Sequence, residues 1–282
     1  MFANLLALPF LLGTLSFLYL AWNVDSSYAP WMVPFLIIGA LIFILSPQIN
    51  WWWYRRNPPR LSAGLTNLLA RFCGFYQRLS PADQKKYESR IGLFRMGTHW
   101  TPIGWQEDFL PPDVELALAA QAVSLTFHRE EFLFPAFEKI IVYPRPFPSP
   151  EYPYPHSSEL YAPDGCLIFS AENVMHAFFN PGKFYHIGLY EYARAFVMAY
   201  PEESWPVLDA TITWQQLALV SGMSKNHVET AIGLSDPDPL GVAIHHFFVF
   251  PDHFKKEMSI EHTILAQIFS VSSLPFTTGT AK

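Results

Sequence analysis

Cysteine and charged residues, basic ones above all, are scarce in this sequence of 282 residues. The two cysteines, Cys73 and Cys166, are too few for a disulfide framework or a four-cysteine zinc site. Charged residues make up 15% of the chain and the formal net charge is −6, which argues against nucleic acid as a partner. The sequence also has no internal repeat, no glycine-rich phosphate loop and no Gly-x-Ser-x-Gly nucleophile elbow.

Long hydrophobic runs, in contrast, open the chain. The first covers residues 5–22 without a charge, and the second begins at residue 31 and continues to about residue 49. Each approaches the length that a helix needs to cross the hydrocarbon core of a bilayer. The first run lacks the basic region and the small-residue cleavage site of a signal peptide. Residues 1–60 therefore predict a transmembrane hairpin, and the alternative is a buried helical hairpin of a soluble protein.

The residues after the second run indicate how such a hairpin is oriented. Three tryptophans at 51–53 suit the membrane interface, and Arg55, Arg56 and Arg60 follow them. The link at residues 23–30 carries a single charge, Asp25. Because positive charge favours the cytoplasmic side, we expect a two-pass protein of the bacterial inner membrane with both ends in the cytoplasm. The remaining chain has a formal charge of −8, since residues 1–60 hold three arginines and one aspartate, and anionic headgroups would repel it.

The rest of the chain predicts one α+β domain that is mostly helical. We expect a helix or linker at residues 61–79, the domain at residues 80–274 and a loose tail at 275–282. Ser80, Pro81 and Asp83 form a helix-start signal, and Ser259 is a second candidate cap. Periodicity and propensity predict helices at about 65–79, 80–96, 113–125, 183–200, 213–221, 240–250 and 259–272, strands at 139–143 and 165–169, and loop at 97–112. Six prolines between residues 144 and 155 predict an irregular surface segment, with a ligand for an aromatic groove as the alternative.

The segment Tyr190-Glu191-Tyr192-Ala193-Arg194 is similar to the zinc-binding helix of metallopeptidases with its histidines replaced. In His-Glu-x-x-His, two histidines on one helix face bind zinc and the glutamate acts as general base for the metal-bound water. Here Glu191 is present, but Tyr190 and Arg194 occupy the ligand positions. Arginine carries a permanent charge and has no lone pair to offer a metal. The segment therefore raises the question of whether this domain is a working enzyme.

Three segments, taken in order, resemble the Mlc titration factor A family of zinc-dependent peptidases. They are Ala119-Ala120-Gln121-Ala122 with the later strand end Val142-Tyr143-Pro144, the helix at 187–194, and Ala243-Ile244-His245-His246-Phe247-Phe248 with Pro251 beyond. The resemblance covers about residues 80–270. It implies a zincin-like domain similar to the peptidase domain of anthrax lethal factor. It also implies a family with peptidase activity that is named for binding a transcriptional repressor of sugar metabolism.

Matched residue by residue, the resemblance keeps the catalytic glutamate and replaces all three zinc ligands. The histidine ligands fall on Tyr190 and Arg194, and the glutamate ligand falls on His245, or on His246 if the register slips by one. The family's aspartate shortly after the zinc helix is also missing. We therefore expect no metal cofactor, with Arg194 neutralising a buried Glu191 where zinc would otherwise sit. The alternative is a solvent-exposed ion pair between Glu191 and Arg194, three residues apart on one helix, which contributes little to stability.

A rebuilt zinc site is the competing interpretation. His186 lies four residues before Tyr190 and would share its helix face, and His245 and His246 could approach from the third segment. Imidazoles suit zinc, but the charge of Arg194 would repel a dication. Because neighbouring residues on a helix point in different directions, at most one of His245 and His246 would face the site.

Three functions follow from these interpretations. The first is a membrane-anchored pseudopeptidase that binds a protein or peptide partner, such as a regulator. The second is an active zinc peptidase with rearranged ligands and Glu191 as its base. In the third, the transmembrane hairpin assembles with another membrane protein. In each case we expect the lipid bilayer to be a partner of the hairpin.

Overall fold

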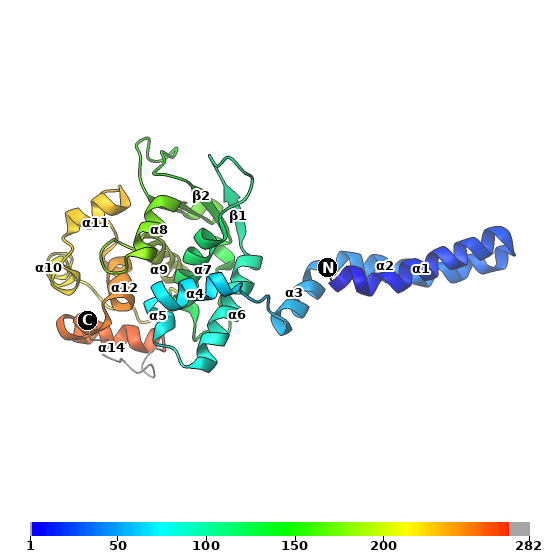
Figure 1. Ribbon diagram of the computed structural model, residues 1–282, viewed down its shortest axis with the longest axis horizontal. Helices are drawn as coiled ribbons and strands as arrows, with labels where there is room; N and C mark the ends of the chain where they lie inside the picture. The colour runs from blue at the N-terminus through cyan, green and yellow to red at the C-terminus, as the bar shows by residue number, and fades with distance from the viewer. Residues whose placement is uncertain (1, 271–282) are drawn as a thin grey trace. The chain divides into compact units, whose positions relative to one another are not determined.

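The computed structural model describes residues 2–270 of the chain, in two compact units that divide between Pro59 and Arg60. The first unit contains α1 (Phe2–Asn23), a short 3-10 turn (Ser26–Tyr28), α2 (Ala29–Ile44) and α3 (Ser46–Arg56). Figure 1 shows α1 and α2 lying side by side. By length and composition, the first helix and the Ser26–Ile44 segment are each long and apolar enough to cross a membrane.

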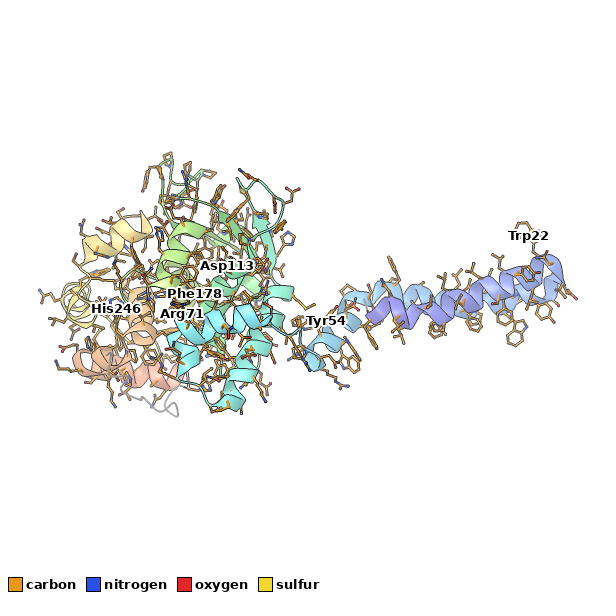
Figure 2. All side chains as sticks on the ribbon, viewed as in Figure 1. Trp22, Tyr54, Arg71, Asp113, Phe178 and His246 are labelled. Atoms are coloured by element: carbon orange, nitrogen blue, oxygen red, sulfur yellow. The ribbon has the colours of Figure 1, made fainter. Side chains whose placement is uncertain are left out.

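Packing between α1 and α2 depends on small and aromatic side chains. A Cβ atom on Gly13 would lie only 2.4 Å from the ring of Phe35, so glycine allows the two helices to approach. The outward faces are strongly apolar and exposed, and Trp22, labelled in Figure 2, is 83% exposed. The prediction of one continuous helix at about 31–49 differs from the structure, in which α2 and α3 cover this region. The helix is interrupted at Leu45, because Pro47 opens a new helix in its first turn.

The second unit is mostly helical with a small sheet, as the composition of its segments predicts. Its helices are α4 (Ala63–Phe72), α5 (Gly74–Gln77), α6 (Pro81–Gly97), α7 (Pro112–Thr126), α8 (Ala171–Phe179), α9 (Ile187–Ala199), α10 (Ala210–Ser221), α11 (Lys225–Ile232), α12 (Pro239–Val249), α13 (Pro251–Glu257) and α14 (Ser259–Ile268). Helix α7 is buried at Val114 and from Leu116 to Thr126, and it packs against α6 and α9 (Figure 1). It is the core helix that its run of alanine and leucine predicts.

The sheet has four strands in the order β1-β2-β4-β3. Strands β1 (His99–Pro102), β2 (Lys139–Tyr143) and β4 (Cys166–Ser170) are parallel, and β3 (Ser158–Tyr161) pairs antiparallel with β4 at the edge. The predictions of β2 and β4 are confirmed. The prediction of loop throughout 97–112 is wrong, because β1 lies at its start. The proline segment at 144–155 is irregular, and a bridge between Phe147 and His156 closes it into a loop.

The predicted start of α6 is confirmed, whereas the predicted boundaries of two other helices differ from the structure. Ser80 caps α6 by accepting a hydrogen bond from the backbone N–H of Asp83, as predicted. The helix predicted at 65–79 is divided at Cys73 into α4 and α5, and Leu69, Phe75 and Tyr76 pack into the core of the second unit. Ser259 is not a cap, because Met258 precedes α14 without a capping side chain. The predicted tail at 275–282 lies outside the described residues.

Candidate functional site

Helix α9 places the motif residues in the interior of the second unit. Tyr190 is 3% exposed and Glu191 is fully buried, while the side chain of Arg194 is 31% exposed. The helix faces α7 on one side and α12 on the other. Glu191 and Arg194 are three residues apart, so both reach the same part of the helix surface. Burial of Glu191 excludes the interpretation of this pair as a solvent-exposed ion pair.

Glu191 has a hydrogen-bond donor for each carboxylate oxygen. Ser158, from the edge strand β3, donates its hydroxyl to Oε1 at 2.8 Å, and Nη1 of Arg194 donates to Oε2 at 2.7 Å. Burial raises the pKa of Glu191, and the charge of Arg194 and the Ser158 hydrogen bond oppose that rise. Desolvation would lower the pKa of Arg194, but Glu191, Tyr190 and Asp238 together outweigh it and the pKa is raised. We call Ser158, Tyr190, Glu191 and Arg194 the Glu191 cluster.

Helix α12 closes the other side of the Glu191 cluster. A Cβ atom on Gly241 would lie 3.0 Å from both Cγ of Arg194 and Cε2 of Tyr190, so the helices meet closely at this glycine. The Tyr190 hydroxyl accepts a hydrogen bond from the backbone N–H of Asp238 at 2.9 Å. Asp238 in turn caps α12 through the backbone N–H groups of Leu240 and Gly241. The start of α12 is therefore hydrogen-bonded to Tyr190, the residue at the expected first ligand position.

His245 lies on the side of α12 that faces the start of α9. Its Nε2 accepts a hydrogen bond from the backbone N–H of His186 at 3.1 Å, and its Nδ1 lies 2.9 Å from Nδ1 of His246. Because Nε2 accepts, the neutral ring carries its proton on Nδ1 and donates it to His246. Burial lowers the pKa of His245 well below its ordinary value, so the ring stays neutral. Both ring nitrogens of His245 are therefore occupied within the protein.

The aromatic ring of Tyr185 lies between His245 and the Glu191 cluster. It stacks on His245 with 4.1 Å between ring centroids and lies 5.9 Å from the ring of Tyr190. His246, labelled in Figure 2, instead lies beside Phe250 and interacts with the backbone of Leu217 on α10. Of the two histidines, His245 is thus the one that lies beside the start of α9.

The expectation that His186 shares a helix face with Tyr190 is wrong. Helix α9 begins at Ile187, and His186 precedes it in a non-helical conformation with ψ of 83°. Its Nε2 is buried without a hydrogen-bond partner among the described residues, and its side chain lines a separate cavity. Burial lowers the pKa of His186 to about 4. The helix predicted to start at residue 183 starts four residues later, which moves this histidine off the helix.

The residues at the expected ligand positions do not fit a zinc ion. A zinc ligand offers a lone pair, and Arg194 has none. The hydroxyl of Tyr190 accepts from Asp238, and burial raises its pKa, so it remains a neutral phenol. Both nitrogens of His245 are occupied, as described above. Within residues 2–270, no group of three or more histidines, cysteines, aspartates or glutamates is placed to hold a metal.

Proton abstraction by Glu191 is also disfavoured by this arrangement. A general base needs a free oxygen within hydrogen-bond reach of the proton it removes. Here each oxygen accepts from a protein donor, and the carboxylate has no solvent exposure. The cluster holds a charge pair whose carboxylate is shielded from solvent and hydrogen-bonded at both oxygens by protein donors.

Sequence reasoning missed three residues that complete this site. Ser158, Asp238 and Gly241 lie 33 to 51 positions away from the motif residues that they contact, so no local spacing indicates them. The helix-start signal at Asp238 followed by Pro239 is visible in the sequence, and it could have identified the cap of α12.

Comparison with known proteins agrees with the resemblance described above. The family model for the glucose-regulated metallo-peptidase M90 matches residues 49–199. An uncharacterized protein of Synechocystis sp. strain PCC 6803 is 30% identical over 120 residues, which is 43% of this chain and 38% of that protein. The chain thus spans well under two thirds of the length of that relative. Because the family model matches more than half of its residues, the chain belongs to the glucose-regulated metallopeptidase family, also known as the Mlc titration factor A family.

Proposed function

We propose that this chain is a membrane-anchored pseudopeptidase, in which a zincin-like domain binds a protein or peptide partner without cleaving it. The observation that carries the proposal is the ion pair between Arg194 and the fully buried Glu191. In an active family member the corresponding glutamate faces a metal-bound water. Here a fixed cation on the same helix neutralises it, and the charge balance of the interior needs no metal.

The surroundings of the pair support a stable replacement rather than a damaged site. Ser158 satisfies the second oxygen of Glu191, and the backbone of Asp238 satisfies the hydroxyl of Tyr190. Gly241 leaves the space that the longer side chains of Tyr190 and Arg194 occupy. A site that had merely lost its metal would retain an unpaired buried carboxylate, which is strongly unfavourable.

The first unit supports the membrane part of the proposal. Two apolar helices with exposed outer faces precede a helix that contains three tryptophans and ends in Arg55 and Arg56. Aromatic residues at the interface and arginines beyond it indicate a hairpin with both ends on the cytoplasmic side of the inner membrane. We expect the protein to resist carbonate extraction. We also expect a cysteine-reactive impermeant reagent to label Asp25→Cys, but not Asn57→Cys, in intact cells.

Metal content and peptidase activity of the full chain, purified in detergent, test the proposal. We expect less than stoichiometric zinc and no metal-dependent cleavage of unstructured peptides. Stoichiometric zinc together with activity that a chelator abolishes and Glu191→Gln removes would instead establish an active peptidase with rearranged ligands.

A gain-of-binding experiment tests the positional match independently. The triple variant Tyr190→His, Arg194→His and His245→Glu restores the ligand set of the family on α9 and α12. We expect it to bind zinc that the parent protein lacks. The matched control carries the same changes together with Glu191→Gln, which removes the general base but no zinc ligand, so it should still bind zinc. A folded triple variant without zinc would show that these three positions are not the family's ligand positions.

A further inference from the structure

A cavity of about 100 Å³ lies in the second unit, between α5, α7, α8, α9 and the end of α12. Its walls are mostly apolar and include four phenylalanines: Phe72, Phe75, Phe178 and Phe248. Phe178, labelled in Figure 2, extends from α8 so that its ring lies 6.1 Å from that of Phe72 at the end of α4. No residue of the Glu191 cluster lines this cavity, so it is a separate site.

Two polar side chains in this wall lack hydrogen-bond partners among the described residues. Gln121 of α7 is 8% exposed, and neither its amide nitrogen nor its amide oxygen is bonded. His186 is 9% exposed, and its Nε2 is unbonded. Unsatisfied buried polar atoms destabilise a fold and are rare in native proteins. Such atoms around one cavity therefore indicate a bound molecule, and one that accepts hydrogen bonds would pair with the amide N–H of Gln121.

Helix α9 approaches Gln121 closely at a glycine. A Cβ atom on Gly188 would lie 2.2 Å from Oε1 of Gln121, so a side chain at this position would displace the glutamine amide from its present place. An apolar residue at 121 would pack here without unsatisfied atoms, which makes the glutamine an unfavourable choice for packing alone.

Arg78 gives the cavity a positive charge. It donates one hydrogen bond to the carbonyl oxygen of Phe248 at 3.2 Å, and no ion pair includes it among the described residues. Desolvation lowers the pKa of Arg78, and Cys73 and the exposed Asp252 oppose this effect. None of the lining residues is acidic. Gly74, Arg78 and Val249 also line an open hollow of about 350 Å³ at the surface, so Arg78 lies between the cavity and solvent.

We propose that this cavity binds a small monocarboxylate with a compact aromatic or branched aliphatic body. The carboxylate accepts hydrogen bonds from the guanidinium of Arg78 and the amide N–H of Gln121, and the apolar body lies against the phenylalanines. Arginine is the residue best suited to a carboxylate, because its planar donors match the two oxygens. At about 100 Å³ the cavity is smaller than the roughly 150 Å³ that accepts a benzene ring, so the carboxylate extends towards the open hollow beside Arg78. The inference is independent of the function proposed for the Glu191 cluster.

Benzoate and 3-methylbutanoate are suitable probes, and benzamide is the neutral control of the same shape. The full chain is reconstituted in lipid nanodiscs, so that no detergent competes for the cavity, and binding is measured by calorimetry and by thermal shift. We expect benzoate to bind with a dissociation constant of about 1 mM or tighter and to raise the melting temperature. Benzamide should bind at least about tenfold more weakly, because it lacks the charge-assisted hydrogen bonds.

Two variants of cavity residues test whether benzoate binds in the cavity. Arg78→Met and Gln121→Leu should each weaken benzoate binding about tenfold or more, whereas Lys85→Met, which removes a charge from an exposed position on α6, should leave it unchanged. Equal binding of benzoate and benzamide to the parent protein, or no saturation by about 10 mM, would overturn the proposal without reference to any variant. Binding that survives both cavity substitutions would also overturn it, because the carboxylate would then be bound elsewhere.

Discussion

Removal of Arg194 is the substitution that most directly tests how the Glu191 cluster is stabilised. Arg194→Met retains the apolar stem of the side chain and removes the guanidinium. It leaves Glu191 fully buried with a single hydrogen bond from Ser158. Breaking a buried ion pair by removing one partner typically costs 3–5 kcal/mol, roughly. Because the Arg194 side chain is 31% exposed, we expect the lower end of that range, about 3 kcal/mol at pH 7.

The cost should depend on pH in a specific direction. Burial already raises the pKa of Glu191, and removal of the guanidinium takes away an opposing interaction, so the pKa rises further. A carboxyl group with a raised pKa holds its proton more tightly in the folded state than in the unfolded chain. Lowering the pH from 7 to 5 therefore favours the folded variant, and the cost shrinks by at most about 1.4 kcal/mol per pH unit.

Urea denaturation of the protein in mild detergent, followed by near-ultraviolet circular dichroism, measures this cost. On a Glu191→Gln background, Arg194→Met should cost about 1 kcal/mol or less at both pH values, since no buried charge is left unpaired. Arg95→Met is the matched control, because its partner Glu115 is 20% exposed. We expect about 1 kcal/mol or less there, without recovery at pH 5. A cost below about 0.5 kcal/mol for Arg194→Met, or one that is constant between pH 7 and 5, would refute this account of the cluster.

Three further predictions concern the interior of the second unit. Burial lowers the pKa of His186 to about 4, of His246 to about 3 and of His245 well below its ordinary value, so the unfolded chain binds protons that the folded one excludes. The free energy of unfolding should fall below pH 6.5 by up to about 1.4 kcal/mol per pH unit for each histidine. Urea midpoints measured at several pH values should therefore fall less steeply with decreasing pH in His186→Asn than in the parent protein, by the contribution of one histidine. Gln121→Leu should raise the melting temperature of the ligand-free protein by a few degrees, roughly, because it removes two unsatisfied polar atoms from the interior. Gly233→Ala should lower the urea midpoint by an amount equivalent to at least about 1 kcal/mol, because φ is +84° and a Cβ atom would lie 2.6 Å from the backbone of the loop before β3.

The sequence predicts those features of this protein that depend on residues close together in the chain. Helix α9 follows from apolar periodicity, and the pairing of Glu191 with Arg194 follows from their spacing of three residues. The start of α6 follows from the Ser80 cap, and the two apolar helices follow from their composition. Strand β3, in contrast, has the sequence Ser-Glu-Leu-Tyr and follows a proline-rich loop. Neither alternation nor strong strand propensity marks it, because its partner β4 and the covering segments determine its place.

The rest of the site depends on contacts between distant segments. The hydroxyl of Ser158 meets Glu191 only because β3 is the edge strand beside α9. His186 could be assigned to the face of Tyr190 only by assuming that the helix includes it, and the chain instead bends at residue 186. The pairing of Gln121 with Gly188 could not be foreseen either, although Gln121 stands in one of the segments that indicate the family.

The arrangement of charge in the Glu191 cluster constrains how such a site can change. Restoring a histidine at Arg194 alone would remove the cation that neutralises Glu191, while Tyr190 and His245 still could not bind a metal in its place. Restoring a glutamate at His245 alone would add another buried carboxylate without a cation beside it, and would leave His246 without the donor it now has. Each single step towards the zinc site is therefore unfavourable, and only the complete ligand set with a bound metal would restore the balance of charge. On the function proposed above, all three expected ligand positions would have to change together, since a metal beside the ion pair of Arg194 and Glu191 would place a second positive charge there.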